Sequence, residues 1–423
     1  MRYKLSLITS IVLLASTCFM FKIEAASLHL TPAVAQSESA DNRQDDRIEI
    51  TPEEEQTARE RANWGRILLI SDALLAMALF AALAFTGLSA RLKTLLAKVF
   101  RRENAVVAIY FIVFLLLYAA VSFPLDFYRG YIFRHKYGLS NQDFAAWFYD
   151  YSVGQLVGLA LGVPIVLLVY FGLRKTAERW WIWVTAGSVP VAIFLMLIAP
   201  VFIAPLFNKF EPLRDERVKQ EILSLAKIEG IETDDIFQVD ASRQSRAINA
   251  YVNGIGATKR IVLYDTLLNQ FSIDEIKFVM AHEMGHYVLG HVWKGIFLAV
   301  VGVLLGSLFV HLTFHRIVRK HKHRLGFDRI TDVAGMPLIA LLLSIYLSFS
   351  FPFANTFSRR YEHQADEYAL RLTGLNEAAV STFKKLARIN VGELDPGPIV
   401  ELIFYTHPSL KNRIEFAKSY RKI

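Results

Sequence analysis

The sequence predicts a mainly α-helical, polytopic membrane protein that also contains a small α+β domain. Hydrophobic residues make up 54% of its 423 positions, and its mean hydropathy of +0.33 is too high for a soluble protein of this length. Six apolar stretches approach the ~20 residues that an α-helix needs to cross a bilayer. Polar residues gather in two segments, 205–294 and 355–423, which we expect to form the α+β domain.

The N-terminal 66 residues consist of an apolar part and a polar part. Residues 1–35 begin with basic residues, continue with an apolar run and end in an A-x-A pattern, which predicts either a signal peptide or a first transmembrane helix. Residues 36–66 are rich in charge and poor in core residues, so we expect a solvated polar linker that is partly helical around PEEEQTARERA at 52–62. The single cysteine, Cys18, excludes a disulfide framework and a cysteine-rich metal site.

Four transmembrane helices are predicted within residues 67–204 and two within 295–354. The predicted spans are Ile67–Leu88, Ala105–Phe123, Val153–Gly172, Trp181–Ala204, Gly295–Phe314 and Ala334–Ala354. Lys and Arg are frequent in the loops after the first, third and fifth spans, and such basic loops remain in the cytoplasm. This pattern predicts that the two polar segments lie on the other side. It also explains the net charge of +8 without a nucleic-acid partner.

Residues 205–294 contain the pattern of a small mixed domain. Short strands are predicted at Ile236–Val239 and Arg260–Tyr264. A further strand edge between them would allow an extended substrate to add through backbone hydrogen bonds, although ordinary strand and turn residues are the alternative. The candidate substrate-binding residues are Asn249, Ala250 and Tyr251.

The motif His282-Glu283-Met284-Gly285-His286 lies in a stretch with helical apolar spacing. On a helix, His282 and His286 project from one face, where two imidazoles can hold one Zn²⁺ and Glu283 can reach a water bound to it. Two chance histidines on an amphipathic helix are the alternative. Gly285 costs up to about 1 kcal/mol relative to Ala in a helix, which suggests that backbone or substrate passes close to it. His291 is expected behind the site or at the surface.

A catalytic zinc usually has a third protein ligand and one open position. A helix is predicted over residues 358–369, where Glu362 and Asp366 share one face. Glu362 can complete a His₂Glu site, and Asp366 one turn further can hold a ligand histidine or a partner arginine. An exposed, charged helix is the alternative reading of the same residues.

Several motifs together resemble the M48 zinc metalloproteases, and most closely the Ste24-type CAAX prenyl proteases. They are HEMGH at 282–286, SRRYEHQADEYA at 358–369 and THPSL at 406–410, with supporting stretches at 204–210, 249–251 and 259–268. The resemblance covers about residues 65–420. It implies six or seven spans around a chamber, with a zincin-type metalloprotease domain made of 205–294 and 355–423. It also suggests an integral protein of a bacterial inner membrane.

The resemblance carries over to individual residues. His282, His286 and Glu362 match the ligands of one Zn²⁺ per chain, and Glu283 matches the catalytic carboxylate. Asp366 matches an acid behind the ligands, which is sometimes described as a proton donor. Two positions that steady the substrate or the oxyanion match His407 and Arg413.

The resemblance implies a peptide or protein substrate that is lipidated or membrane-associated, a lipid bilayer as surroundings, and no nucleic acid. Eukaryotic family members place the catalytic part on the cytosolic side, opposite to the side that the loop charges predict here. Two other functions stay open: quality control of membrane proteins by a protease of the same superfamily, and a non-catalytic membrane scaffold with a structural metal. A structural site usually has four protein ligands, which is an argument against the scaffold.

Overall fold

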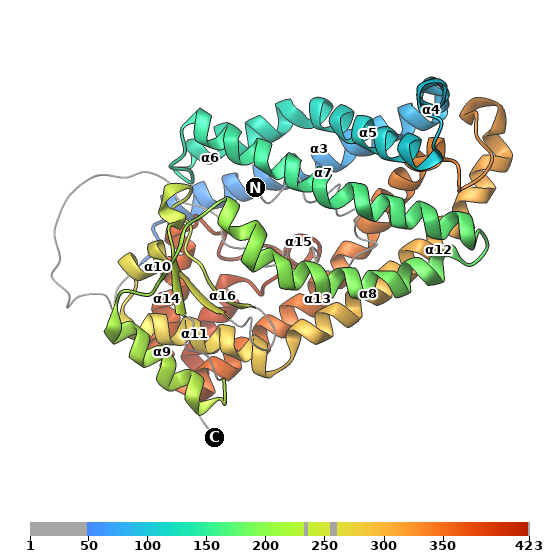
Figure 1. Cartoon of the computed structure of the whole chain (residues 1–423). Coiled ribbons are helices and arrows are strands. Elements are labelled where there is room, and N and C mark those ends of the chain that lie inside the picture. The colour runs from blue at the N-terminus through green and yellow to red at the C-terminus, as the bar shows by residue number, and fades with distance from the viewer. Residues whose placement is uncertain (1–48, 232–235, 254–259, 422–423) are drawn as a thin grey trace.

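The computed structural model describes residues 49–231, 236–253 and 260–421. The segment predicted to be a signal peptide or a first transmembrane helix, 1–35, lies outside the described residues. In Figure 1 the described chain forms long helices that run side by side, with a sheet and shorter helices gathered at one end. This arrangement confirms the predicted fold class of a helical membrane protein with a small α+β domain.

Six helices in the described part are long and apolar enough to cross a membrane. The π-helical turns at Tyr128–Ile132 and Ala199–Ile203 do not interrupt the helices that contain them. The six helices are α3 (Pro52–Phe85), α5 (Glu103–Phe127) continued through α6 (Phe133–Lys136), α7 (Phe144–Lys175), α8 (Trp180–Ile198) continued to Leu206, α12 (His291–Leu325) and α13 (Met336–Thr373).

The first of these helices is longer than the predicted span. Thr51 caps α3, because its side chain accepts from the Glu54 amide and the Glu54 carboxylate accepts from the Thr51 amide. Pro52 then occupies the first helical turn, where its missing N–H costs nothing. From Pro52 onward the predicted linker 36–66 is continuous helix, which agrees with the helical stretch expected around residues 52–62 and extends it into the first span, because the charged residues there are good helix formers.

The last of the six helices also passes through a predicted boundary. α13 runs without interruption from Met336 to Thr373, although Pro352 lies inside it. Pro352 removes one backbone hydrogen bond but does not end the helix. Gly374, with a φ of 67°, ends it instead. The predicted division between a span ending at Ala354 and a separate polar helix is therefore absent, and one continuous helix carries both.

A four-stranded sheet in the order β1-β2-β4-β3 forms the β part of the small domain. β2 (Ile236–Val239) and β4 (Arg260–Tyr264) pair in parallel and have the predicted bounds, while β1 (Phe210–Pro212) and β3 (Ala250–Asn253) pair antiparallel at the two edges. Helices α9 (Glu216–Ile228) and α11 (Ile273–Val288) pack on the sheet. The fully buried contacts are Ile222, Ile261, Leu263, Met280 and Met284.

The C-terminal helices cover the other side of α11. α14 (Asn376–Ile389) and α16 (Leu410–Ser419) enclose, with α11 and α13, a core of buried residues around Phe278 and Phe383, while α15 (Pro398–Phe404) packs against α13. Two short helices, α10 (Asp265–Gln270) and α4 (Leu88–Val99), complete the fold, with α4 at the end of the long helices that is far from the sheet (Figure 1). Helix α11 thus lies at the centre of the small domain.

Candidate active site

Helix α11 positions the two histidines of the HEMGH motif. Ser272 and Glu275 form a capping box at its start, and the buried Glu275 carboxylate also accepts from Ser381 at 2.6 Å and from Lys385 at 2.9 Å. The helix ends at Val288, and Gly290 with a φ of 68° lets the chain turn directly into α12. These contacts tie α11 to α14 and fix where its side chains point.

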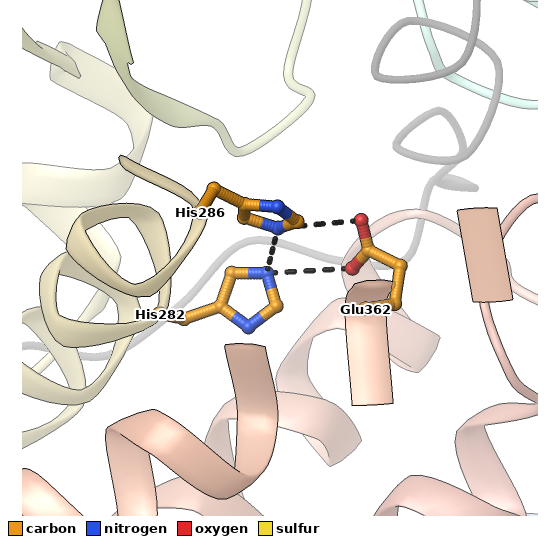
Figure 2. A group of neighbouring side chains, drawn as sticks. All are labelled: His282, His286 and Glu362. Atoms are coloured by element: carbon orange, nitrogen blue, oxygen red, sulfur yellow. Dashed lines mark hydrogen bonds and ion pairs between the residues drawn. The ribbon is translucent and has the colours of Figure 1, made fainter. Parts of the chain in front are cut away.

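The structure brings the third predicted residue to the two histidines. His282 Nε2 lies 3.3 Å from Glu362 Oε2, and His286 Nε2 lies 3.4 Å from Glu362 Oε1. The two Nε2 atoms lie 3.1 Å apart (Figure 2). Glu362 comes from α13, so a helix of the membrane part and a helix of the small domain meet at this point.

Gly285 explains how α11 and α13 come so close. A Cβ atom at Gly285 would lie 3.0 Å from Cδ1 of Tyr368 on α13, closer than real Cβ atoms normally approach a neighbour. The sequence suggested that backbone or substrate passes close to this glycine. In the structure the neighbour is the Tyr368 ring, so the glycine serves helix packing.

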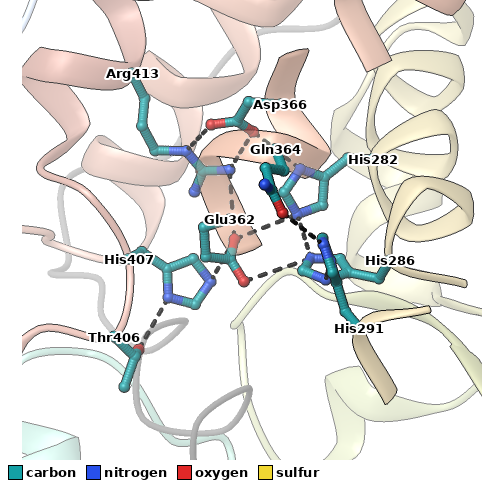
Figure 3. Close-up of polar contacts among 9 residues, drawn as sticks. All are labelled: His282, His286, His291, Glu362, Gln364, Asp366, Thr406, His407 and Arg413. Carbon is teal, nitrogen blue, oxygen red and sulfur yellow. Dashed lines mark hydrogen bonds and ion pairs between the residues drawn. The ribbon is translucent and has the colours of Figure 1, made fainter. Parts of the chain in front are cut away.

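Asp366 holds two of the other predicted residues. Its Oδ1 accepts from His282 Nδ1 at 2.9 Å, and Arg413 donates to both of its oxygens at 2.6 and 2.7 Å (Figure 3). The Arg413 guanidinium also stacks 4.4 Å from the ring of Phe383. Asp366 and Arg413 are 1% and 8% exposed, so this bidentate pair is shielded from water and fixes the ring of His282.

His407 approaches the same carboxylate from the C-terminal loop. Its Nε2 lies 3.0 Å from Glu362 Oε2, and its Nδ1 lies 2.9 Å from the Thr406 hydroxyl. Arg413 is farther from Glu362, at 3.8 Å. The structure therefore places both residues at the site, His407 at Glu362 and Arg413 mainly at Asp366.

His291 lies behind the ligand pair and is fully buried. Its Nδ1 is 3.0 Å from His286 Nδ1, and its Nε2 is 3.1 Å from Gln364 Oε1. The expectation that His291 lies behind the site or at the surface is thus resolved in favour of a contact with His286. Gln364 was not predicted, because a glutamine in the middle of a helix gives no signal in the sequence.

A cavity of about 340 Å³ opens beside these residues. Glu283 lines it together with His282, His407 and Arg413. Of the three predicted substrate-binding residues, Asn249 and Ala250 line the cavity and Tyr251 does not. The Tyr251 ring instead lies 6.4 Å from that of Tyr264 within the sheet.

Helix α3 forms part of the wall of this cavity, which the sequence did not suggest. Arg61 and Arg66 line it. Arg66 pairs with Glu393 at 2.7 Å, and Tyr405 donates to the same carboxylate at 2.6 Å. The first turns of α3 are therefore joined to the C-terminal part of the small domain.

The three converging side chains have the properties of a metal site. With metal–ligand distances of about 2.0–2.1 Å, tetrahedral ligand atoms lie about 3.3 Å apart, close to the 3.1, 3.3 and 3.4 Å found here. Among the described residues, none donates a hydrogen bond of good geometry to the buried Glu362 Oε2. The Glu362 carboxylate and the ring nitrogens of His282 and His286 thus face one another, which is the arrangement that a bound cation requires.

The charges around the histidines favour a cation as well. Burial opposes a positive charge on His282, but the carboxylates of Asp366 and Glu362 outweigh it and raise the pKa of His282 to about 10. Burial lowers the pKa of His286 to about 3, against the pull of Glu362. Without an ion, His282 therefore carries a second ring proton at neutral pH, and a metal cation can replace that proton.

Comparisons with known proteins agree with this site. A family model described as peptidase family M48 matches residues 212–421, and one described as CAAX prenyl protease N-terminal, five membrane helices, matches 47–209. The chain is 36% identical over 372 residues to a Bacillus subtilis protein named uncharacterized metalloprotease YhfN, covering 87% of this chain and 86% of that protein. The chain belongs to peptidase family M48.

Two further relatives connect this M48 peptidase to the CAAX proteases. It is 34% identical over 311 residues to CAAX prenyl protease 1 of Saccharomyces cerevisiae, covering 70% of this chain and 68% of that protein. The crystal structure of S. mikatae Ste24p superposes with a TM-score of 0.77 at 25% identity, over 98% of this chain and 99% of that one. This M48 peptidase is accordingly a membrane-embedded, multi-pass metalloprotease that acts on peptides or proteins.

Proposed function

We propose that this M48 peptidase is a zinc endopeptidase with one Zn²⁺ per chain. The observation that carries the proposal is that His282, His286 and Glu362 meet next to Glu283 at one cavity. Two imidazoles and one carboxylate, with a fourth position left for water, are the ligands of catalytic zinc sites, whereas structural sites are closed by four protein ligands. This difference favours an enzyme over a scaffold with a structural metal.

Glu283 is the general base in this proposal. When bound, zinc polarises the scissile carbonyl and lowers the pKa of a water molecule. Glu283 lines the cavity next to His282, so its carboxylate can take the proton of the attacking water and pass it to the leaving amine. Asp366 accepts from His282 Nδ1 and so keeps Nε2 of the same ring available for the ion.

His407 and Arg413 bring ring and guanidinium nitrogens to the cavity wall. We assign His407 to the oxyanion that develops during hydrolysis, because its ring reaches Glu362 from the cavity side. Arg413 is bound to Asp366 at both oxygens, so its first role is to hold Asp366 in place. Its guanidinium adds to the positive potential at the oxyanion.

The substrate is assigned to the edge of the sheet. Among the strands that the structure describes, β3 lies at the edge of the sheet and pairs with β4, and an edge strand is where an extended peptide can add. Asn249 and Ala250 line the cavity at the start of this strand. We assign the backbone of Tyr251, rather than its ring, to the same interaction, because the ring packs in the sheet.

The natural substrate in this proposal is a lipidated C-terminal peptide at a bacterial inner membrane. The support is the name CAAX prenyl protease of its curated relatives and the membrane position of the site, next to α12 and α13. Unfolded membrane proteins are the other substrate class to be compared, because both kinds of substrate are associated with a bilayer.

The test is a cleavage assay on the purified protein with a farnesylated C-terminal peptide, the same peptide without the lipid, and an unfolded membrane protein. We expect a chelator to abolish cleavage and Zn²⁺ to restore it. The farnesylated peptide should give the highest kcat/KM. Cleavage that continues in the chelator would disprove the metal site, and a preference for the unfolded protein would replace the lipidated peptide with quality control.

A further inference from the structure

Two polar side chains behind His286 take no part in the proposed hydrolysis. His291 is the first residue of α12 and is 0% exposed, and Gln364 lies on α13 two residues beyond Glu362. His291 contacts His286 on one side and Gln364 on the other, at 3.0 and 3.1 Å (Figure 3). Gln364, His291 and His286 thus form a chain of polar contacts that ends at the metal site.

We propose that His291 and Gln364 are positioning residues that hold His286 in the tautomer required for metal binding. This inference rests on the proposed metal site, and it concerns the atom of His286 that carries the ring proton. A neutral imidazole has one N–H and one lone pair, and only the nitrogen with the lone pair can bind a metal ion.

The hydrogen bonds determine where each proton lies. Gln364 Oε1 can only accept, so His291 Nε2 is the donor in the contact between them. His291 Nδ1 then carries the lone pair of a neutral ring. The hydrogen between the two Nδ1 atoms therefore belongs to His286, which donates it to His291. His286 Nε2 is left with its lone pair, pointing at His282 Nε2 and Glu362 Oε1.

The two ligand histidines are thus held in the same way by different partners. Asp366 accepts from His282 Nδ1, and His291 accepts from His286 Nδ1. Both rings present Nε2 to the metal site. Glu362 and Gln364 both come from α13. Glu362 contacts His286 at Nε2, and Gln364 acts on His286 Nδ1 through His291.

The surroundings of His291 prevent it from turning to solvent. Its ring stacks on Tyr361 with the centroids 4.6 Å apart and an angle of 18° between the planes. If the acceptor at His291 Nδ1 were lost, the Nδ1–H of His286 would lose the partner that fixes its position. The competing tautomer, with the proton on Nε2, would then block the metal. Outer partners of this kind typically change metal affinity by about 10–100-fold.

The test compares Zn²⁺ affinities of purified full-length variants by competition with a chromophoric chelator. His291→Phe keeps a ring on Tyr361 but removes the acceptor, so Zn²⁺ binding should weaken by about 10–100-fold. His291→Asn keeps an acceptor close to the Nδ1 position and should bind nearly as tightly as the wild type. The exposed His363, whose ring lies 4.4 Å from that of Phe416, provides the matched control, and His363→Phe should have no effect.

Gln364→Leu is the second variant, and it remains informative if His291→Phe fails to fold. It should weaken Zn²⁺ binding by less than His291→Phe, because His291 can still adopt the accepting tautomer. The variant that combines both substitutions should bind Zn²⁺ no more weakly than His291→Phe alone. Both substitutions act through the same hydrogen bond, the one from His286 Nδ1 to His291 Nδ1. The absorption spectrum of the Co²⁺-loaded protein should change in His291→Phe and not in His363→Phe.

The outcomes separate this inference from the proposed function. If His291→Phe folds and binds Zn²⁺ as tightly as the wild type, or if the effects of the two substitutions simply add, the inference is wrong while the metal site stands. If His286→Phe itself binds Zn²⁺ as tightly as the wild type, the proposed metal site is wrong, and the inference is wrong with it.

Discussion

Each predicted metal ligand is contacted by a side chain from a different helix or loop. Asp366 holds His282, His291 holds His286, and His407 reaches Glu362. Ligands that are oriented in this way lose little freedom when an ion binds, so the affinity for the ion does not depend on the ligands alone. At the scale of residues, the site therefore depends on partners that the HEMGH motif does not include.

The role of Glu283 can be tested by removing only its charge. Glu283→Gln keeps the size of the side chain and does not alter a metal ligand, so Zn²⁺ should remain bound at one ion per chain. Cleavage should fall by at least about 10²-fold, the contribution typical of a general base. The measurement is kcat on a peptide substrate together with the zinc content of the same sample. Cleavage at the wild-type rate would show that another group activates the water.

The raised pKa of His282 predicts how metal binding depends on pH. Because the pKa of His282 is about 10 without an ion, this ring holds its proton below that pH, and the ion must displace it. Zn²⁺ affinity should therefore rise about tenfold per pH unit between pH 6 and 8. His286, with a pKa of about 3, stays neutral in this range and adds no slope.

Calorimetric titrations in buffers with different enthalpies of ionisation measure both the affinity and the protons released. An affinity that does not change between pH 6 and 8, with no proton released, would contradict the protonated state of His282. The variant Asp366→Asn removes one of the two carboxylates that raise the pKa, so its slope should be smaller.

At the scale of elements, the site exists only because α11 and α13 cross closely. Gly285 on α11 faces the Tyr368 ring on α13 at the crossing, one residue before His286. Ala281 and Ala369 are both fully buried in the core beside it. Small residues on both helices allow an approach that larger ones would prevent. The distance between Glu362 and the two histidines therefore depends on packing.

Gly285→Ala should disturb this crossing. A Cβ atom 3.0 Å from the Tyr368 ring requires the helices to move apart, at a cost of about 1–3 kcal/mol for an overpacked core. That cost exceeds the gain of up to about 1 kcal/mol from replacing glycine in a helix. We expect a lower melting temperature and weaker Zn²⁺ binding.

Gly302 in α12 is the matched control, because no atom lies within 4 Å of a Cβ built there. Gly302→Ala should leave the melting temperature unchanged or raise it. If Gly285→Ala behaved in the same way in thermal unfolding, the close crossing at Tyr368 would not limit the packing.

At the scale of the whole molecule, the basic loops and the metal site lie at opposite ends. The C-terminal end of α12 and α4, which carry many of the basic residues, are at the end of the long helices that is far from the sheet (Figure 1). If the basic loops are cytoplasmic, the metal site then faces the other side of the membrane. This orientation stays a prediction from the loop charges.

Cysteine labelling can determine the orientation, because the chain has a single cysteine that can be replaced first. In a Cys18→Ser background, Glu415→Cys on the exposed side of α16 should react with a membrane-impermeant maleimide added to spheroplasts. Arg329→Cys, at a side chain that is 81% exposed in the basic loop, should react only after the membrane is opened. The reverse labelling pattern would place the site in the cytoplasm.

Part of the fold was predictable from local patterns. The apolar stretches, the helix with the HEMGH motif and the strands Ile236–Val239 and Arg260–Tyr264 all follow from periodicity within about 20 residues. The ends of helices were less predictable. α3 starts at Pro52 and α13 continues to Thr373, because a charged sequence can extend a helix when another element packs on it, and periodicity does not report that packing.

The sequence by itself determined the chemistry of the candidate site: which residues can bind a metal, and which carboxylate can act as a base. Only the tertiary structure decided that Glu362 reaches the two histidines, that His291 and Gln364 support His286 from behind, and that α3 lines the cavity. The physical reason is that residue types carry their donor and acceptor atoms wherever they occur. Which of those atoms meet depends on side chains such as Gly285 and Tyr368, whose packing sets how closely distant helices cross.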